Sequence, residues 1–108
     1  MQAKEQRNNL TIDYGTSKEY FAIRIMSEDM KNAHFQVGAV VVVRKQSYAS
    51  NGDIVLVLHN GKICFRYYAK DENGIYLTAA NNEILPVMVK AADDFIILGK
   101  AKELRLEI

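Results

Sequence analysis

Side chains able to act as a nucleophile or a metal ligand are few and scattered in this sequence. Cys64 is the single cysteine, and His34 and His59 lie in no CxxC or Cys/His cluster, so we expect neither a metal site nor an intrachain disulfide. A lone cysteine on a strand is more often a small packing residue than a reactive thiol. Ser27 offers a hydroxyl, but no movable base stands beside it, and we interpret it as a structural hydroxyl.

The elements that must position these residues are short strands. Residues 54–58 are an apolar run, and His59-Asn60-Gly61 has the composition of a tight turn, because Asn and Gly tolerate positive φ. We therefore predict a β-hairpin whose second strand covers residues 62–68. The two-residue period of that strand places Cys64 and Arg66 on one face and Phe65 on the other.

The rest of the chain repeats this pattern of short strands and turns. Strands are expected at residues 20–26, 40–43, 75–78 and 95–98, with the alternation at 104–108 as a further strand or as the continuation of a bent one around Gly99. The β-branched run at 40–43 is apolar on both faces, which is typical of a central strand. Helix candidates are confined to residues 29–33 and 91–94. The fold class predicted is all-β with at most short helices.

Composition sets the broad class. With 108 residues, 49% hydrophobic and 25% charged, the chain has the size and apolar content of one globular domain. Residues 1–9 are polar, and we interpret them as a flexible arm or linker end before a single domain at 10–108. The formal net charge of +1 argues against DNA binding by this chain alone, and no apolar run approaches a bilayer-spanning length, so a cytoplasmic protein is expected.

Six motifs in order resemble the peptidase domain shared by LexA, UmuD and phage repressors of the lambda type. They are FAIRIMSEDM at residues 21–30, GAVVVV at 38–43, GDIVLV at 52–57, NGKICFRYY at 60–68, LTAAN at 77–81 and FIILGKA at 95–101. The match runs from about residue 20 to residue 106. The fifth motif departs from the family pattern because it lacks that pattern's proline. The resemblance implies the family's β fold, with no cofactor.

The resemblance places the family's catalytic serine at Asp29 and its catalytic lysine at Arg66. A guanidinium keeps its proton in proteins and is no general base, so we expect an inactive peptidase-like domain. The two positions lie within hydrogen-bonding reach in the family, which suggests an Asp29–Arg66 ion pair. If that pair is buried, removing one partner should cost about 3 to 5 kcal/mol. The alternative is a solvated Arg66 with Asp29 as a helix N-cap.

For a domain without the nucleophile and the base, the remaining activity that the resemblance implies is self-association. We expect an oligomerisation domain of a phage-repressor-like transcriptional regulator, acting as a homodimer or higher oligomer. DNA would be reached only through a helix-turn-helix domain absent from this chain. The alternating C-terminal residues are the candidate dimer edge: Leu104, Arg105, Leu106, Glu107 and Ile108.

Two other functions remain open at this point. One is a binding subunit resembling UmuD, or the target of an antirepressor protein, which acts without an attached DNA-binding domain. The other is a peptidase whose catalytic residues are displaced.

Overall fold

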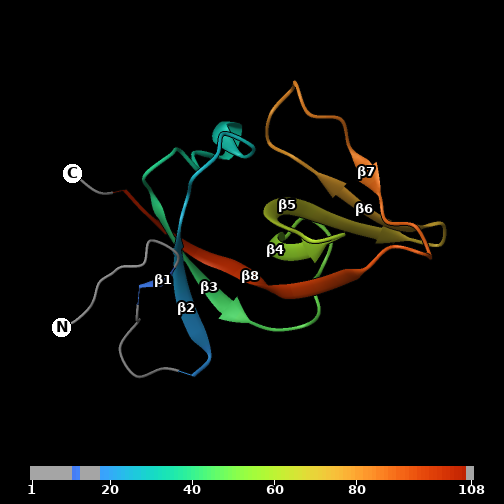
Figure 1. Cartoon of the computed structure of the whole chain (residues 1–108), viewed down its shortest axis with the longest axis horizontal. Coiled ribbons are helices and arrows are strands. Elements are labelled where there is room, and N and C mark those ends of the chain that lie inside the picture. Colours follow the sequence, from blue (N-terminus) through green and yellow to red (C-terminus); the bar gives the residue numbers. More distant parts are fainter. Residues whose placement is uncertain (1–10, 13–17, 107–108) are drawn as a thin grey trace.

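The computed structural model describes residues 11–12 and 18–106 and consists mainly of strands (Figure 1). The strands are β1 (Thr11–Ile12), β2 (Tyr20–Arg24), β3 (Val40–Lys45), β4 (Ile54–His59), β5 (Lys62–Asp71), β6 (Gly74–Thr78), β7 (Val87–Met88) and β8 (Phe95–Arg105). The one helical element in these residues is the short 3-10 helix η1 (Lys31–Ala33). The all-β prediction is confirmed. The predicted arm at residues 1–9 lies outside the described residues.

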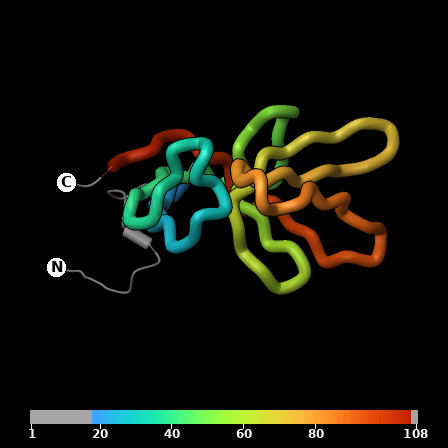
Figure 2. Tube along the Cα trace, turned by 90° about the horizontal axis from the view of Figure 1, so that it is seen from above, coloured from blue at the N-terminus to red at the C-terminus, as the bar shows by residue number. Residues whose placement is uncertain are grey.

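The strands form one antiparallel sheet in the order β1-β2-β3-β8-β4-β5-β6-β7. Strand β8 joins its two parts, because its later residues pair with β3 and its earlier residues pair with β4. Figure 2 shows β8 passing from one lobe of the molecule to the other. The register shifts on both sides, which bends the strand. A Cβ on Gly99 would collide with the carbonyl oxygen of Arg44, so the close approach of β3 requires glycine there.

Two apolar clusters hold the sheet together. The first contains the alternating residues of β2 and β3 together with Met30, Phe35, Leu56 and Phe65. The second lies in the other lobe and contains Val55, Val57, Tyr68, Leu77 and Ile97. Because successive residues of β4 point to opposite faces, that one strand contributes to both clusters. Residues 40–43 are buried, and β3 pairs on both sides, so the predicted central strand is confirmed.

The β4–β5 hairpin forms as predicted. His59 pairs with Lys62, and the turn residues Asn60 and Gly61 have φ of 50° and 86°. Positive φ at both positions matches the right-handed twist of the flanking strands. Strand β5 continues to Asp71, three residues beyond the prediction, because β6 pairs with it from Tyr67 onward. The hairpin is the rigid element on which the site is built.

Elsewhere the structure differs from the sequence predictions in detail. Residues 91–94 form a turn and not a helix, because Asp93 accepts the backbone N–H of Lys90 and closes the chain locally. Strand β2 ends at Arg24, two residues earlier than expected. The C-terminal alternation belongs to a single bent strand. Among the described residues no helix has the length and apolar character that crossing a bilayer requires.

Candidate functional site

The loop after β2 carries the first candidate residue, Asp29, toward strand β5. Ile25 exchanges two backbone hydrogen bonds with the segment before β3, through Ala39 O at 2.8 Å and Gly38 N at 2.9 Å. After Ile25 the chain leaves the sheet. Met30 is 2% exposed and anchors the far end of the loop in the first cluster. Asp29 is therefore held between two buried apolar residues.

A second segment, residues 79–81, fixes the same loop from the side. The Asn81 amide nitrogen donates to Glu28 O at 3.0 Å, and its amide oxygen accepts from Glu83 N at 2.9 Å. The N–H of Asn32 donates to Ala80 O at 2.8 Å. Asn81 is the buried polar residue of the described chain, at 9% exposure. Sequence reasoning matched Asn81 to a motif but assigned it no role; its position beside a small apolar pair was the available signal.

Asp29 and Arg66 form an ion pair, with Arg66 Nη1 3.1 Å from Asp29 Oδ2. The same Nη1 donates to the carbonyl oxygen of Phe65 at 2.8 Å. The Arg66 side chain is 15% exposed and that of Asp29 is 33% exposed. The expected pair is present. The alternative does not hold: the Arg66 side chain is largely buried and paired with Asp29, and the residue that caps η1 is Met30, without a side-chain cap bond.

Cys64 lies two residues before Arg66 on β5, on the same face of the strand, and packs against the second cluster. Burial raises the pKa of the Cys64 thiol, the nearby Arg66 guanidinium opposes that rise, and the Asp29 carboxylate adds to it. The thiol is therefore a poor nucleophile near neutral pH, because the thiolate is the reactive form. This agrees with the packing role expected from the sequence.

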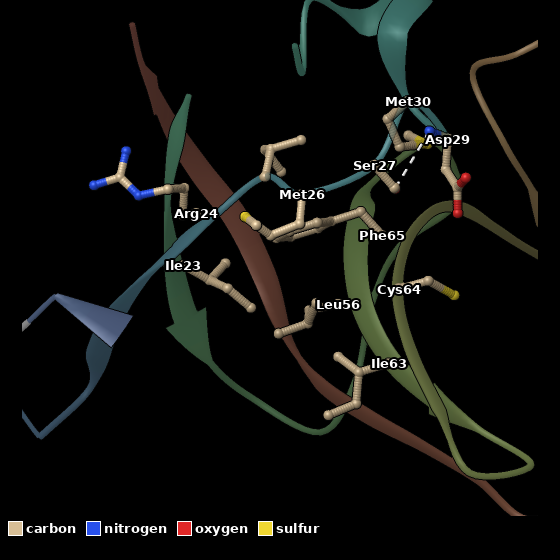
Figure 3. Close-up of a pocket in the computed structure, with 11 residues that line it drawn as sticks. Ile23, Arg24, Met26, Ser27, Asp29, Met30, Leu56, Ile63, Cys64 and Phe65 are labelled. Atoms are coloured by element: carbon tan, nitrogen blue, oxygen red, sulfur yellow. Dashed lines mark hydrogen bonds between the residues drawn. The ribbon is translucent and has the colours of Figure 1, made fainter. Parts of the chain in front are cut away.

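A cleft of about 250 Å³ lies between the loop after β2 and the hairpin. Figure 3 shows Ser27 and Asp29 from the loop on one side and Cys64, Phe65 and Ile63 from β5 on the other. Two of the residues that line the cleft are exposed and apolar: Met26 is 64% exposed and Ile63 is 55% exposed. Ser27 is exposed, and its Oγ accepts a long hydrogen bond of 3.4 Å from Asp29 N. The cleft offers apolar surface with an ion pair beside it.

The two histidines do not join this site. His59 Nε2 lies 2.9 Å from Asp93 Oδ2, at the tip of the hairpin. His34 ends η1 with φ of 69°, in the left-handed region. No group of three or more His, Cys, Asp or Glu side chains with metal-binding geometry occurs among the residues that the structure describes.

The candidate dimer edge is the last part of β8. Strand β4 pairs with β8 from Phe95 to Lys100, so beyond Lys100 no described strand lies on that side. Leu104 packs partly against the first cluster, and Leu106 is 55% exposed. Glu107 and Ile108, the other predicted edge residues, lie outside the described residues.

Comparison with known proteins gives a consistent result. Residues 2–102 match the model of a family described as Peptidase S24-like. The LexA repressor of Thermotoga neapolitana is 34% identical over 82 residues, which cover 76% of this chain and 41% of the relative. The LexA repressor of Ruminiclostridium cellulolyticum is 34% identical over 91 residues, covering 84% of this chain and 41% of the relative. The chain thus spans about two fifths of the length of these curated relatives.

Proposed function

Because this chain belongs to the Peptidase S24-like family and its relatives are repressors, we propose that it is the self-associating domain of a repressor-type regulator and does not cleave itself. The observation that carries the proposal is the Asp29–Arg66 ion pair at 3.1 Å. It occupies the two positions where the family resemblance places a serine and a lysine. A charge contact there replaces the nucleophile and the base.

The chemistry of both side chains supports the absence of peptide cleavage. Amide hydrolysis by a dyad needs a hydroxyl that loses its proton to a neutral amine. Arg66 keeps its proton, and its Nη1 is already committed to Asp29 Oδ2 and Phe65 O. The Cys64 thiol has a raised pKa, and Ser27 contacts only a backbone N–H in the described structure, so neither substitutes for the missing pair.

Self-association gives such a domain a use without catalysis. Joining two DNA-binding domains makes the second DNA contact intramolecular and raises the overall affinity for DNA by roughly 100-fold to 10,000-fold where geometry permits. In this proposal the DNA-binding domains belong to the parent protein, and they correspond to the part of the relatives' length that this chain does not span. The end of β8 is the surface assigned to the dimer, because none of the described strands pairs with it on the β4 side, and such a strand edge is a template for pairing with a second copy.

The peptidase part of the proposal is tested by intact-mass spectrometry of the full chain over several days, from neutral to alkaline pH. Unchanged mass at every pH is the expected result. A discrete fragment that survives in Cys64→Ala but disappears in Ser27→Ala would contradict it and identify a displaced nucleophile.

The assembly part is tested by sedimentation equilibrium over a wide range of concentrations. A reversible dimer is expected, and Leu106→Pro should weaken it, because proline removes a backbone donor from the edge. Leu106 follows the last residue of β8, so the monomer's own strand pairing stays intact. Leu106→Ala is the matched control, since it shortens the side chain and keeps the N–H. Unchanged association of the proline variant would exclude this edge.

A further inference from the structure

Asparagine followed by glycine occurs in three turns of the described chain: Asn51-Gly52, Asn60-Gly61 and Asn73-Gly74. All three asparagines are exposed. The dipeptide suits a turn, but asparagine is also chemically labile. Glycine has no Cβ, so its backbone nitrogen can approach the amide carbon of the preceding side chain closely. How the fold holds each asparagine side chain therefore decides which turn is open to reaction.

The backbone of distant segments holds the first two side chains. The Asn51 amide donates to the carbonyl oxygen of Lys70 at 3.2 Å and accepts from the N–H of the same residue at 2.7 Å. The backbone nitrogen that follows Asn51 donates to Tyr68 O at 2.8 Å. The Asn60 amide oxygen accepts from Asp94 N at 2.9 Å. In both turns these bonds must break before the amide carbon can meet the following nitrogen.

The Asn73 side chain makes no such bond within the described residues. Its turn is held by Asp71, whose Oδ1 accepts the N–H of Asn73 at 2.7 Å and the N–H of Gly74 at 3.2 Å. Both bonds go to the backbone, and the second is long. Asp71 and Gly74 are also the last pair between β5 and β6, and the end of a hairpin opens at a low free energy. The Asn73 amide is therefore the least restrained of the three.

We propose that Asn73 is a site of spontaneous deamidation, at which water converts the amide into a carboxylate, while the fold protects Asn51 and Asn60. The Gly74 nitrogen attacks Asn73 Cγ, the bond from Cγ to the amide nitrogen breaks, and ammonia leaves with the proton of the Gly74 N–H. Water then opens the resulting cyclic imide at either carbonyl carbon. One opening gives aspartate, and the other gives isoaspartate, in which the backbone continues through Cγ. Neither step needs an oxidant or a reductant.

The reaction changes both the charge and the length of the turn. Asp71 and Glu72 precede the site, so a carboxylate at residue 73 places three acidic groups in succession. Isoaspartate also adds one carbon to the backbone between the two paired residues, which displaces Gly74 from its pairing. A Cβ built on Gly74 would lie 3.0 Å from Met88 Cε, so the chain has little room on that side. Deamidation therefore weakens the end of the β5–β6 hairpin.

Peptide mapping by mass spectrometry, on the full chain kept folded at mildly alkaline pH, measures conversion at each asparagine. Asn73 should convert faster than Asn51 and Asn60 by roughly tenfold, the factor that about 1.4 kcal/mol of protecting hydrogen bonds gives. The product should be a mixture of aspartate and isoaspartate. Asn73→Gln should stay intact at this turn, because the longer side chain closes a ring less readily, and should leave the other two rates unchanged. An Asn73 that stays intact, or that converts no faster than the other two, overturns the proposal.

The chain unfolded in guanidinium chloride separates the effect of the fold from that of the local sequence. All three asparagines should then convert at similar rates, because glycine follows each of them. If Asn51 and Asn60 stay slow in the unfolded chain, their neighbours in sequence protect them, and the bonds to Lys70 and Asp94 do not. That result overturns protection by the fold. Circular dichroism checks that the native sample remains folded throughout.

Discussion

Breaking the Asp29–Arg66 contact from either side should destabilise the domain, but by different amounts. Asp29→Leu leaves the guanidinium, at 15% exposure, with the carbonyl oxygen of Phe65 as its acceptor within the described part of the chain. Losing the partner of a fully buried charge costs about 3 to 5 kcal/mol, and an exposed pair contributes about 0 to 1 kcal/mol. Because this pair is only partly buried, we expect a loss of about 3 kcal/mol for Asp29→Leu.

Arg66→Met should cost less, about 1 to 2 kcal/mol. Asp29 is 33% exposed, so water can replace the lost partner, and methionine keeps most of the apolar packing of the arginine stem. The double variant Asp29→Leu/Arg66→Met leaves no uncompensated charge and should lie within about 1 kcal/mol of the wild type. The cycle therefore predicts a coupling energy of about 3 kcal/mol or more between the two positions.

Urea unfolding at one fixed protein concentration measures these differences. With a slope of about 1.5 kcal/mol per molar urea, a loss of about 3 kcal/mol moves the midpoint by about 2 M. The control is Arg44→Met, whose ion pair with Glu19 spans 3.8 Å with side chains 42% and 69% exposed, and which should change stability by less than about 1 kcal/mol. If Asp29→Leu and Arg66→Met both unfold at the same urea concentration as the wild type, the ion pair does not stabilise the domain.

Three further outcomes follow from the structure. The pKa of Asp93 is lowered to about 2 from 3.8, chiefly by its hydrogen bond to His59, so its contribution to stability is present above pH 4 and lost as pH falls toward 2; urea unfolding of Asp93→Asn should show a shallower acid loss over that range. The thiol of Cys64 should react with iodoacetamide at pH 8 more slowly in the folded chain than in urea, and equal rates would contradict its raised pKa. Gly99→Ala should cost about 1 to 3 kcal/mol in thermal unfolding, because its Cβ meets the backbone of Arg44, and a wild-type midpoint would show that β3 can move away.

Local patterns were enough to predict most of the strands. The Asn60-Gly61 turn, the buried run of residues 40–43 and the alternation within β5 depend on neighbours in the chain, and each appears in the structure as expected. The assignment of the site to Asp29 and Arg66 needed the family motifs, because 37 residues separate the two positions and no local period relates them.

Tertiary structure decided what depends on contacts between distant segments. Whether residues 95–108 made two strands or one was settled by β3 and β4, which pair with successive parts of β8 and bend it at the register shifts. Residues 91–94 form a turn in place of the expected helix, because the Asp93 carboxylate forms hydrogen bonds with the Lys90 N–H and the His59 ring. Asn81 acquired its role only when residues 79–81 met the loop of Asp29. Sequence by itself determined the periods and turns, because these arise from neighbouring residues. The sheet order, the partly buried charge contact and the open edge at the end of β8 arise from which strands pair in the folded chain.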